Sequence, residues 1–381
     1  MVPLRCNKKD FKYMSGLNKT SAEVWNLCVQ IDKDYKLKNQ KSATLSILEF
    51  ATKQKFFMHA KGIQHAVFKY YNARFAMWQS RKARHKNSGY VELPYKEKSF
   101  LSTGWDDQAI RCDYGKGKIK LTAVKGQGQV TCNAKSIPRN IVEIELVYKD
   151  KYYLAIKYKE ENNTNLIQSD SVASIDLGEI HAITSIDNNG NSIIITNRLV
   201  RSLVRLKDKR KKELLSLRSR CQKGSRKYNK YTRAILKIRC EFDKKINDII
   251  HKQTKKYVSW CEDRGIRQIY YGDLDGVTRN SKDRLRKSTN QKLNMWRFGQ
   301  IENKLNYKLF NIGTSMIKIN EAYTSQKCPA CGKLNKTSTR NYGCKCGYSQ
   351  HRDIVGAINI LNNNSDYNIQ RYVIKEYLQI C

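Results

Sequence analysis

The sequence predicts a multi-domain protein of the α/β class. Apolar side chains recur at helical spacing over residues 18–88, and they alternate with polar side chains over residues 89–170, as in strands. From residue 171 onward, strand-like and helix-like segments follow one another. The 381 residues are enough for two or three packed units, each with its own core.

The chain is strongly basic, with 73 Lys and Arg against 34 Asp and Glu and a formal net charge of +39. Such a chain repels itself unless a polyanion neutralises it, and nucleic acid is the natural polyanion. A ribosomal or chromatin-like binder, or a genome bias toward Lys and Asn, would give the same charge. The sequence has no apolar run of membrane-spanning length and no signal-peptide pattern at its start, so we expect an intracellular protein outside the membrane.

Residues 18–88 are expected to be helical. Thr20 and Glu23 have the spacing of a capping box. An aromatic and aliphatic stripe follows, which we expect to lie in the core: Val67, Tyr70, Tyr71, Phe75 and Trp78. A basic end comes after the stripe, and we expect it to contact phosphate groups through Arg81, Lys82 and Arg84.

Residues 89–170 are expected to form strands. Apolar and polar side chains alternate over residues 119–123 and again over residues 154–158. Glycines mark tight turns between the apolar segments, at Gly115, Gly117, Gly126 and Gly128. The pattern predicts a small antiparallel sheet or barrel.

The third region begins with three expected strands. The first ends at residues 174–178, the second covers residues 183–186, and the third covers residues 193–195 after the turn signal Asn188-Asn189-Gly190. Further along, residues 269–274 and 315–320 read as strands, and residues 296–310 and 353–361 read as helices.

A long helical hairpin is expected from Arg198, with a break at Gly224-Ser225. Its two apolar stripes are expected to pack against the rest of the domain. On the remaining faces Lys and Arg outnumber Asp and Glu about four to one, which is too one-sided for an ordinary solvated helix. We interpret these faces as a nucleic-acid track that includes Arg210, Lys211, Lys212, Arg226 and Lys227.

Four of the twelve cysteines are clustered, and the other eight are scattered singly. The cluster consists of Cys328, Cys331, Cys344 and Cys346, in two short knuckles that are each followed by Gly. Four thiolates suit one tetrahedral zinc ion and leave no open position on it, so the zinc is expected to be structural. The second knuckle is C-x-C, which is tighter than the usual C-x-x-C, and unmetallated structural cysteines are the alternative.

Two aspartates stand where a nuclease would hold metal ions. Asp176 ends an apolar strand, and Asp353 begins a helix just after the second cysteine knuckle. Nucleases of the ribonuclease H-like fold bind two divalent metals between such carboxylates, and Mg²⁺ suits all-oxygen ligands. Each aspartate alone is weak evidence, because an Asp at a helix start is more often a cap.

Four blocks of the sequence resemble the TnpB family, the transposon-encoded RNA-guided nucleases related to type V CRISPR effectors and to Fanzor proteins. The blocks are residues 174–178 (SIDLG), 272–274 (GDL), 323–332 (YTSQKCPACG) and 351–360 (HRDIVGAINI). The resemblance implies a RuvC-like domain of the ribonuclease H type with an inserted zinc ribbon, a β-barrel wedge domain and a helical recognition lobe.

The implied organisation runs along the whole chain. A first wedge strand is expected in residues 1–17, the helical recognition lobe in 18–88 and the wedge barrel in 89–170. The RuvC-like domain would follow in 171–326 with the basic hairpin at 198–259, then the zinc ribbon in 327–348 and the last RuvC helix in 349–364. Residues 365–381 form a tail to which the sequence gives no role.

The family implies three catalytic carboxylates, of which Asp176 matches the first and Asp353 the third. The middle block usually contains Glu-Asp-Leu, and here Gly272 replaces the Glu. Asp273 matches the neighbouring Asp, and a shift of one residue along a strand points to the opposite face. We therefore expect Glu321, on the following strand, to supply the second carboxylate; the alternative is an exposed Glu321 and an inactive site.

Smaller features of the last block also bear on the site. Val355 and Gly356 replace an Asn and an Ala that are common there. Arg352 is expected either to contact the scissile phosphate or to support Asp353. Asp273 and Arg352 are thus candidates for catalytic support.

The resemblance implies an RNA-guided DNA endonuclease that uses two Mg²⁺ ions and one structural Zn²⁺, with one protein for each guide RNA. It would cut double-stranded target DNA beside a short flanking motif, in the cytoplasm and on the nucleoid, or in the nucleus of a eukaryotic host. A nuclease-inactive RNA-guided repressor is the alternative, favoured by Gly272. A transposase that joins DNA ends is a third and weaker reading.

Overall fold

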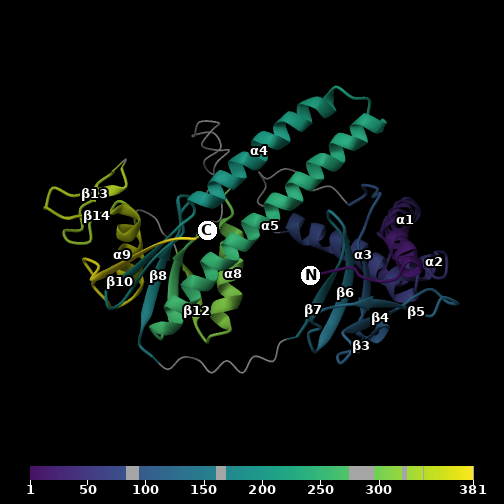
Figure 1. The fold of residues 1–381 in the computed structure, drawn as a ribbon, viewed down its shortest axis with the longest axis horizontal. Coiled ribbons are helices and arrows are strands. Elements are labelled where there is room, and N and C mark those ends of the chain that lie inside the picture. Colours follow the sequence, from purple (N-terminus) through teal and green to yellow (C-terminus); the bar gives the residue numbers. More distant parts are fainter. Residues whose placement is uncertain (83–93, 160–168, 274–295, 320–323, 338, 381) are drawn as a thin grey trace. The chain divides into compact units, whose positions relative to one another are not determined.

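The computed structural model describes residues 1–82, 94–159, 169–273, 296–319, 324–337 and 339–380. The chain divides into two compact units, Met1–Glu161 and Asn162–Cys381 (Figure 1). Both units combine helices with sheets, so the expected multi-domain α/β class is confirmed. Among the described helices none is both long enough and apolar enough to span a bilayer.

Unit 1 begins with a short strand, β1 (Val2–Pro3), inside residues 1–17 where a first strand was expected. The first helix, α1 (Lys8–Asn39), already starts within the same residues. The Asn7 side chain caps this helix by accepting a hydrogen bond from the Asp10 backbone N–H. The expected capping box at Thr20 and Glu23 is therefore wrong, because both residues lie inside α1.

Two shorter helices follow, α2 (Leu45–Thr52) and α3 (Ala60–Lys82). The aromatic stripe of α3 is only partly in the core. Tyr70 is buried, whereas Phe75 is 55% and Trp78 is 43% exposed. At 3.6 residues per turn, Tyr70, Arg74 and Met77 form the buried face, and the other two aromatic side chains lie about 100° around the helix.

The strands of unit 1 form two antiparallel sheets, as the alternating pattern predicted. The four-stranded sheet has the order β1-β7-β6-β2, and the three-stranded sheet has the order β3-β4-β5. Their bounds are β2 Thr103–Asp106, β3 Ile110–Asp113, β4 Lys118–Thr122, β5 Gln129–Asn133, β6 Ile141–Tyr148 and β7 Tyr152–Tyr158, with a 3-10 turn at Asp107–Ala109. Helices and strands of this unit share one apolar core.

A six-stranded mixed sheet organises unit 2, in the order β12-β11-β8-β9-β10-β15. The bounds are β8 Val172–Asp176, β9 His181–Asp187, β10 Asn191–Thr196, β11 Gln268–Gly272, β12 Ser315–Ile319 and β15 Ile374–Gln379. β8, β9 and β10 form an antiparallel meander, while β11 and β12 continue parallel to β8.

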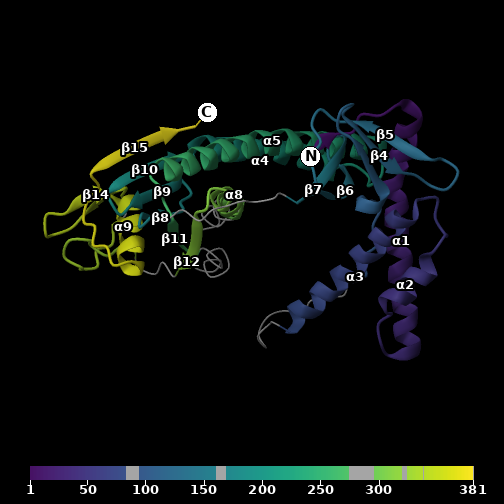
Figure 2. The ribbon, with the colours of Figure 1, turned by 90° about the horizontal axis from the view of Figure 1, so that it is seen from below.

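The C-terminal segment has a role that the sequence did not indicate. β15 pairs in parallel with β10 along its whole length and so completes the edge of the sheet (Figure 2). Its Glu376 accepts a hydrogen bond from Arg264, 2.9 Å away, at the end of α5. The segment is therefore a structural part of unit 2.

Helices cover both faces of the six-stranded sheet. The hairpin helices α4 (Arg198–Ser219) and α5 (Arg226–Asp263) pack with α8 (Phe298–Phe310) against one face. α9 (Arg352–Asn364) packs against the other face. The expected hairpin break is confirmed: Gly224 has φ +87°, and the Ser225 hydroxyl caps α5.

Candidate active site

Asp176 and Asp353 lie close to the same stretch of α9. β8 packs on this helix, and the Ser174 hydroxyl donates a hydrogen bond to the Ala357 carbonyl at 2.6 Å. A Cβ added at Gly356 would lie 2.6 Å from Asp176 Oδ2, so the glycine allows the carboxylate to touch the helix backbone. Asp353 is one turn earlier on α9, and residues three apart are neighbours on a helix surface. The two expected aspartates are thus brought together.

Asp353 is 9% exposed and is held by Arg340. Arg340 Nη1 lies 2.7 Å from Asp353 Oδ1 and 2.9 Å from Oδ2, which is a strong charge-assisted contact. The backbone N–H of Asp353 donates to His351 Nδ1 at 3.3 Å, so His351 caps α9. Nothing in the sequence spacing of Arg340 ties it to Asp353, so this contact is visible only in the folded chain.

Two histidines flank the same carboxylate. His181 Nε2 is 4.0 Å from Asp353 Oδ2, and the His181 and His351 rings meet edge to face at 5.2 Å. Burial lowers the pKa of His181 to about 4, against the opposing effect of Asp353, and burial also lowers the pKa of His351. Both rings are therefore neutral at pH 7, and their nitrogens can accept hydrogen bonds or bind a metal ion beside Asp353.

Gly272 is the neighbour of Asp176 across the sheet. Tyr271 pairs with Ile175 between the parallel strands β11 and β8, so the next pair along the strands is Gly272 and Asp176. On its other side Gly272 pairs with Ile319 of β12. A carboxylate is thus absent from the position in β11 that lies beside Asp176.

Asp273 faces the other side of the sheet. Its carboxylate lies 3.1 Å from Lys318 Nζ, and Lys318 also lies 3.7 Å from Glu302 of α8. Tyr271, two residues earlier, donates a hydrogen bond to Glu302 at 2.9 Å. Because α8 and α9 cover opposite faces, Asp273 is directed away from Asp176.

Of the remaining site candidates, Arg352 lies among the described residues. Arg352 directs its guanidinium toward the Thr337 carbonyl at 3.4 Å, and Arg340 is the arginine that contacts Asp353 in the described structure. Glu321 lies outside the described residues, as does Arg84 of the basic candidates.

The four clustered cysteines fit a zinc ion. Cys328 Sγ lies 3.7 Å from Cys346 Sγ, and Cys331 Sγ lies 3.6 Å from Cys344 Sγ. Tetrahedral zinc with Zn–S bonds of about 2.3 Å requires sulfurs about 3.8 Å apart. All four sulfurs lie within 4.8 Å of one another, so little movement is needed to bind the metal.

The cysteine knuckles are joined to α9. Gly332 and Gly347 follow them with φ of +71° and +86°, values that a tight turn after a knuckle needs and side chains disfavour. Strands β13 (Asn341–Gly343) and β14 (Ser349–His351) form a hairpin, and its buried Tyr342 and Tyr348 pack with Val355 of α9. β14 leads directly into α9.

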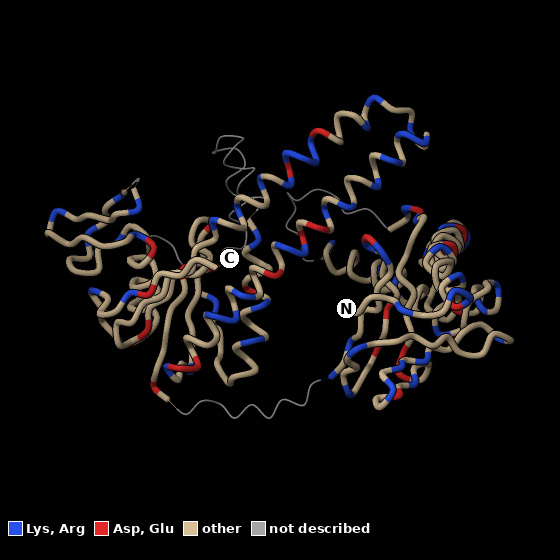
Figure 3. The backbone as a smooth tube through the Cα atoms, viewed as in Figure 1, with Lys and Arg blue, Asp and Glu red and all other residues tan. Residues whose placement is uncertain are grey.

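Basic candidates of the hairpin lie on exposed faces. Figure 3 shows Lys and Arg along both α4 and α5. Arg210, Lys212, Arg226 and Lys227 are exposed, whereas Lys211 is half-buried and lies 3.5 Å from Asp208. At the base of the hairpin lies a cleft of about 680 Å³, lined mostly by α4 with Trp296 and Arg297, and five of its α4 side chains are basic. In unit 1, Arg81 is half-buried near the end of α3, of which Lys82 is the last residue.

Comparisons with known proteins agree with this geometry. Residues 298–360 match the family model described as "Cas12f1-like, TNB domain", and residues 155–278 match the one described as "Probable transposase". A TnpB-like protein of Methanocaldococcus jannaschii is 27% identical over 58% of this chain and 77% of its own length. The chain is related to the TnpB and Cas12f1 proteins. The expected resemblance is confirmed.

Two further comparisons extend the relationship. The CRISPR-associated endodeoxyribonuclease Cas12f1 of Syntrophomonas palmitatica is 22% identical over 65% of this chain. The chain spans about half of that relative, 53% of its length. A cryo-EM structure of a Cas12f1–sgRNA–target DNA complex matches with a TM-score of 0.62 and 14% identity, covering 92% of this chain and 82% of the other. The fold is therefore that of the Cas12f1 proteins.

Proposed function

We propose that this protein is an RNA-guided DNA endonuclease, with a RuvC-like nuclease site between β8 and α9. The observation that carries the proposal is that Asp176, at the end of β8, lies against α9 one turn from Asp353. The position in β11 beside Asp176 is Gly272. The strand order supports it, because a three-stranded antiparallel meander continued by two parallel strands is a ribonuclease H-type arrangement. The relatives are named as an endodeoxyribonuclease and a TnpB-like protein, and these names give no support to the nuclease-inactive alternative.

The residues suit divalent metal ions. Carboxylate oxygens are the ligands that Mg²⁺ prefers, and Asp176 and Asp353 present them from two rigid elements. Two bound Mg²⁺ ions would activate water and stabilise the leaving oxygen of the phosphodiester. Arg340 holds Asp353 through both carboxylate oxygens, and it offers a positive charge next to where the scissile phosphate would bind.

We propose Glu321 as the third carboxylate. β12 is described as far as Ile319, whose partner Gly272 lies beside Asp176. Met316 and Lys318 of β12 face the α8 side, so Ile319 faces the opposite side of the sheet, where Asp176 lies. Glu321 follows Ile319 by two residues in the sequence. Glu321 could thus restore the carboxylate that Gly272 lacks.

The partners follow from charge and from the relatives. The net charge of +39 and the basic faces of α4 and α5 suit a guide RNA paired with one DNA strand. In this class base pairing recognises the target, and the protein recognises only a short flanking motif. The zinc ribbon would be structural and would hold Arg340 in contact with Asp353 of α9.

The proposal is tested by sequencing the RNA that copurifies with the protein and by cleavage of a plasmid that carries a matching target. A defined transcript and Mg²⁺-dependent cleavage beside a fixed motif are expected. Random copurified RNA, together with no cleavage of a library of flanking motifs, would refute it. Tight guided binding without cleavage would establish the repressor instead.

A further inference from the structure

Unit 1 carries an exposed aromatic stripe at the end of α3. Tyr71, Phe75 and Trp78 follow one another at helical spacing beside the buried face of the helix, and the last two are about half exposed. Leaving the Phe75 and Trp78 rings partly in water forgoes the free energy of burying their apolar surface. A ligand that covers them would recover that free energy.

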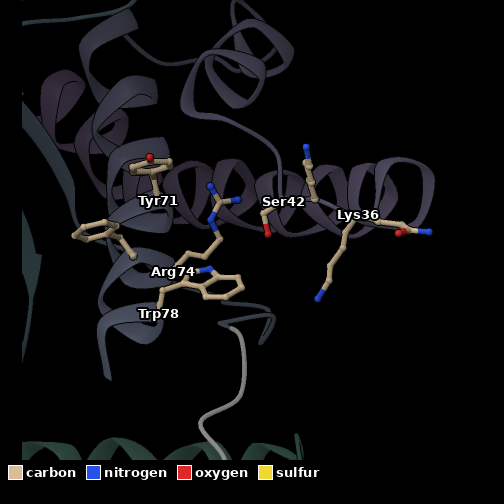
Figure 4. A pocket seen from close by; sticks show the side chains of 8 residues that line it. Lys36, Ser42, Tyr71, Arg74 and Trp78 are labelled. Atoms are coloured by element: carbon tan, nitrogen blue, oxygen red, sulfur yellow. The ribbon is translucent and has the colours of Figure 1, made fainter. Parts of the chain in front are cut away.

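These rings form one wall of a cavity of about 380 Å³ (Figure 4). The opposite wall comes from the last turn of α1 and the segment after it, with Lys36, Lys41 and Ser42. Figure 4 shows Trp78 and Tyr71 on α3, with Lys36 across the cavity and Ser42 between them. The pocket therefore combines flat apolar rings with flexible cations.

The frame of the pocket is fixed by a buried ion pair. Asp32 of α1 is fully buried and accepts hydrogen bonds from Arg74 Nη1 at 2.7 Å, the Tyr70 hydroxyl at 2.8 Å and the Ala43 N–H at 2.8 Å. Arg74 Nη2 donates to the Ala43 carbonyl at 2.7 Å, and its guanidinium lies over the Tyr71 ring at 5.1 Å. The two walls are thus joined before any ligand arrives.

The cations of the pocket are available to an anion. The charge of Arg74 is neutralised by Asp32, whereas neither Lys36 nor Lys41 has an acidic partner among the residues that the structure describes. An aliphatic ligand would not use these charges, and a base pair inside a duplex has both faces covered by its stacked neighbours.

We propose that this pocket binds one unpaired nucleotide of a single strand. Its base stacks on the aromatic wall at Trp78 and Phe75, and Lys36 and Lys41 neutralise its phosphate. RNA and DNA share this chemistry, and the test separates them. The site goes beyond the proposed nuclease function, because it lies within unit 1 and uses none of the proposed catalytic residues.

The test uses the full-length protein, freed of copurified nucleic acid, in Mg²⁺-free buffer. The probes are short single-stranded RNA and DNA containing 2-aminopurine, whose fluorescence falls when the base stacks. Trp78→Ala should remove most of the quenching and weaken binding of at least one strand about tenfold or more, while Trp78→Tyr keeps both. Phe50→Ala is the matched control, because Phe50 is exposed on α2 and does not line the pocket.

A second variant separates the two halves of the proposal. Lys36→Gln should lower the slope of log affinity against log salt by about one, and Trp78→Ala should leave that slope unchanged. If Trp78→Ala weakens the binding of RNA alone or of DNA alone, the affected strand is the ligand of the pocket. The proposal would be overturned if Trp78→Ala weakened the binding of a blunt duplex equally. It would also be overturned if Trp78→Ala and Phe75→Ala both bound the two single strands as the wild type does.

The result is independent of the nuclease site. An Asp176→Ala variant should lose cleavage and retain full 2-aminopurine quenching. Because Trp78 and Phe75 are exposed, each variant should unfold at the wild-type temperature. Such a result would exclude a folding defect as the cause of weaker binding.

Discussion

Removal of the Asp32 carboxylate should strongly destabilise unit 1. Asp32 is fully buried, and its partner Arg74 is also buried, with the two charges 2.7 Å apart. Asp32→Ala would leave the guanidinium charge without its counter-ion and Ala43 N–H and the Tyr70 hydroxyl without an acceptor. Breaking a buried pair by removing one partner costs about 3–5 kcal/mol.

The assay is thermal and urea unfolding of the full chain, followed by circular dichroism and tryptophan fluorescence. For a unit of this size, about 3–5 kcal/mol corresponds to a fall in Tm of roughly 6–20 °C. Trp25 reports on the region directly, because its ring lies edge to face on Tyr70 at 5.2 Å. Unit 2 should unfold as in the wild type.

Asp34→Ala is the matched control, because Asp34 is on the same helix and exposed. It should change the free energy of unfolding by about 0.5 kcal/mol or less. The double variant Asp32→Leu/Arg74→Met should recover much of the loss, since an apolar pair leaves no buried charge. If Asp32→Ala costs no more than Asp34→Ala, the reasoning about the buried pair is wrong.

Three further predictions concern pH, the arginines and the zinc site. Burial lowers the pKa of His59 to about 4, below its unfolded value of about 6.5. The contribution of the neutral His59 ring to the free energy of unfolding is therefore complete above pH 6.5 and is lost as pH falls toward 4. Between pH 7 and 4.5 the free energy of unfolding of the wild type should fall by about 2–3 kcal/mol more than that of His59→Gln. Arg340→Gln should slow cleavage roughly 10- to 100-fold, since it removes a charged contact with Asp353, and Arg352→Gln should slow it less; the reverse order in single-turnover assays would refute this. Cys344→Ser should lower zinc content and cleavage together, and a folded, zinc-free, fully active variant would contradict it.

The sequence predicts the elements of unit 2 well, because their patterns are local. Alternation alone gives Asp273 the opposite strand face from its neighbour, and the structure places it toward Lys318. Gly224 and Ser225 mark the hairpin turn by their own backbone and capping preferences.

What the sequence could not predict depends on tertiary partners. Phe75 and Trp78 share helical spacing with buried residues, and only the packing of α3 decides which stripe is covered. Arg340 meets Asp353 because the cysteine knuckles fold back on α9, which no spacing rule contains. The apolar residues of β15 (Ile374, Tyr377 and Leu378) do not alternate with polar ones, so the strand depends on its pairing with β10.

Asp176, Asp353 and Glu321 are proposed to form one metal-binding nuclease site. The most direct measurement is single-turnover plasmid cleavage with guide RNA and Mg²⁺ for Asp176→Ala, Glu321→Ala and Asp273→Ala. Asp176→Ala and Glu321→Ala should each lose cleavage by about three orders of magnitude or more while guided binding persists, and Asp273→Ala should remain within a few-fold of wild type. Wild-type cleavage by Glu321→Ala, or loss of cleavage in Asp273→Ala alone, would contradict it.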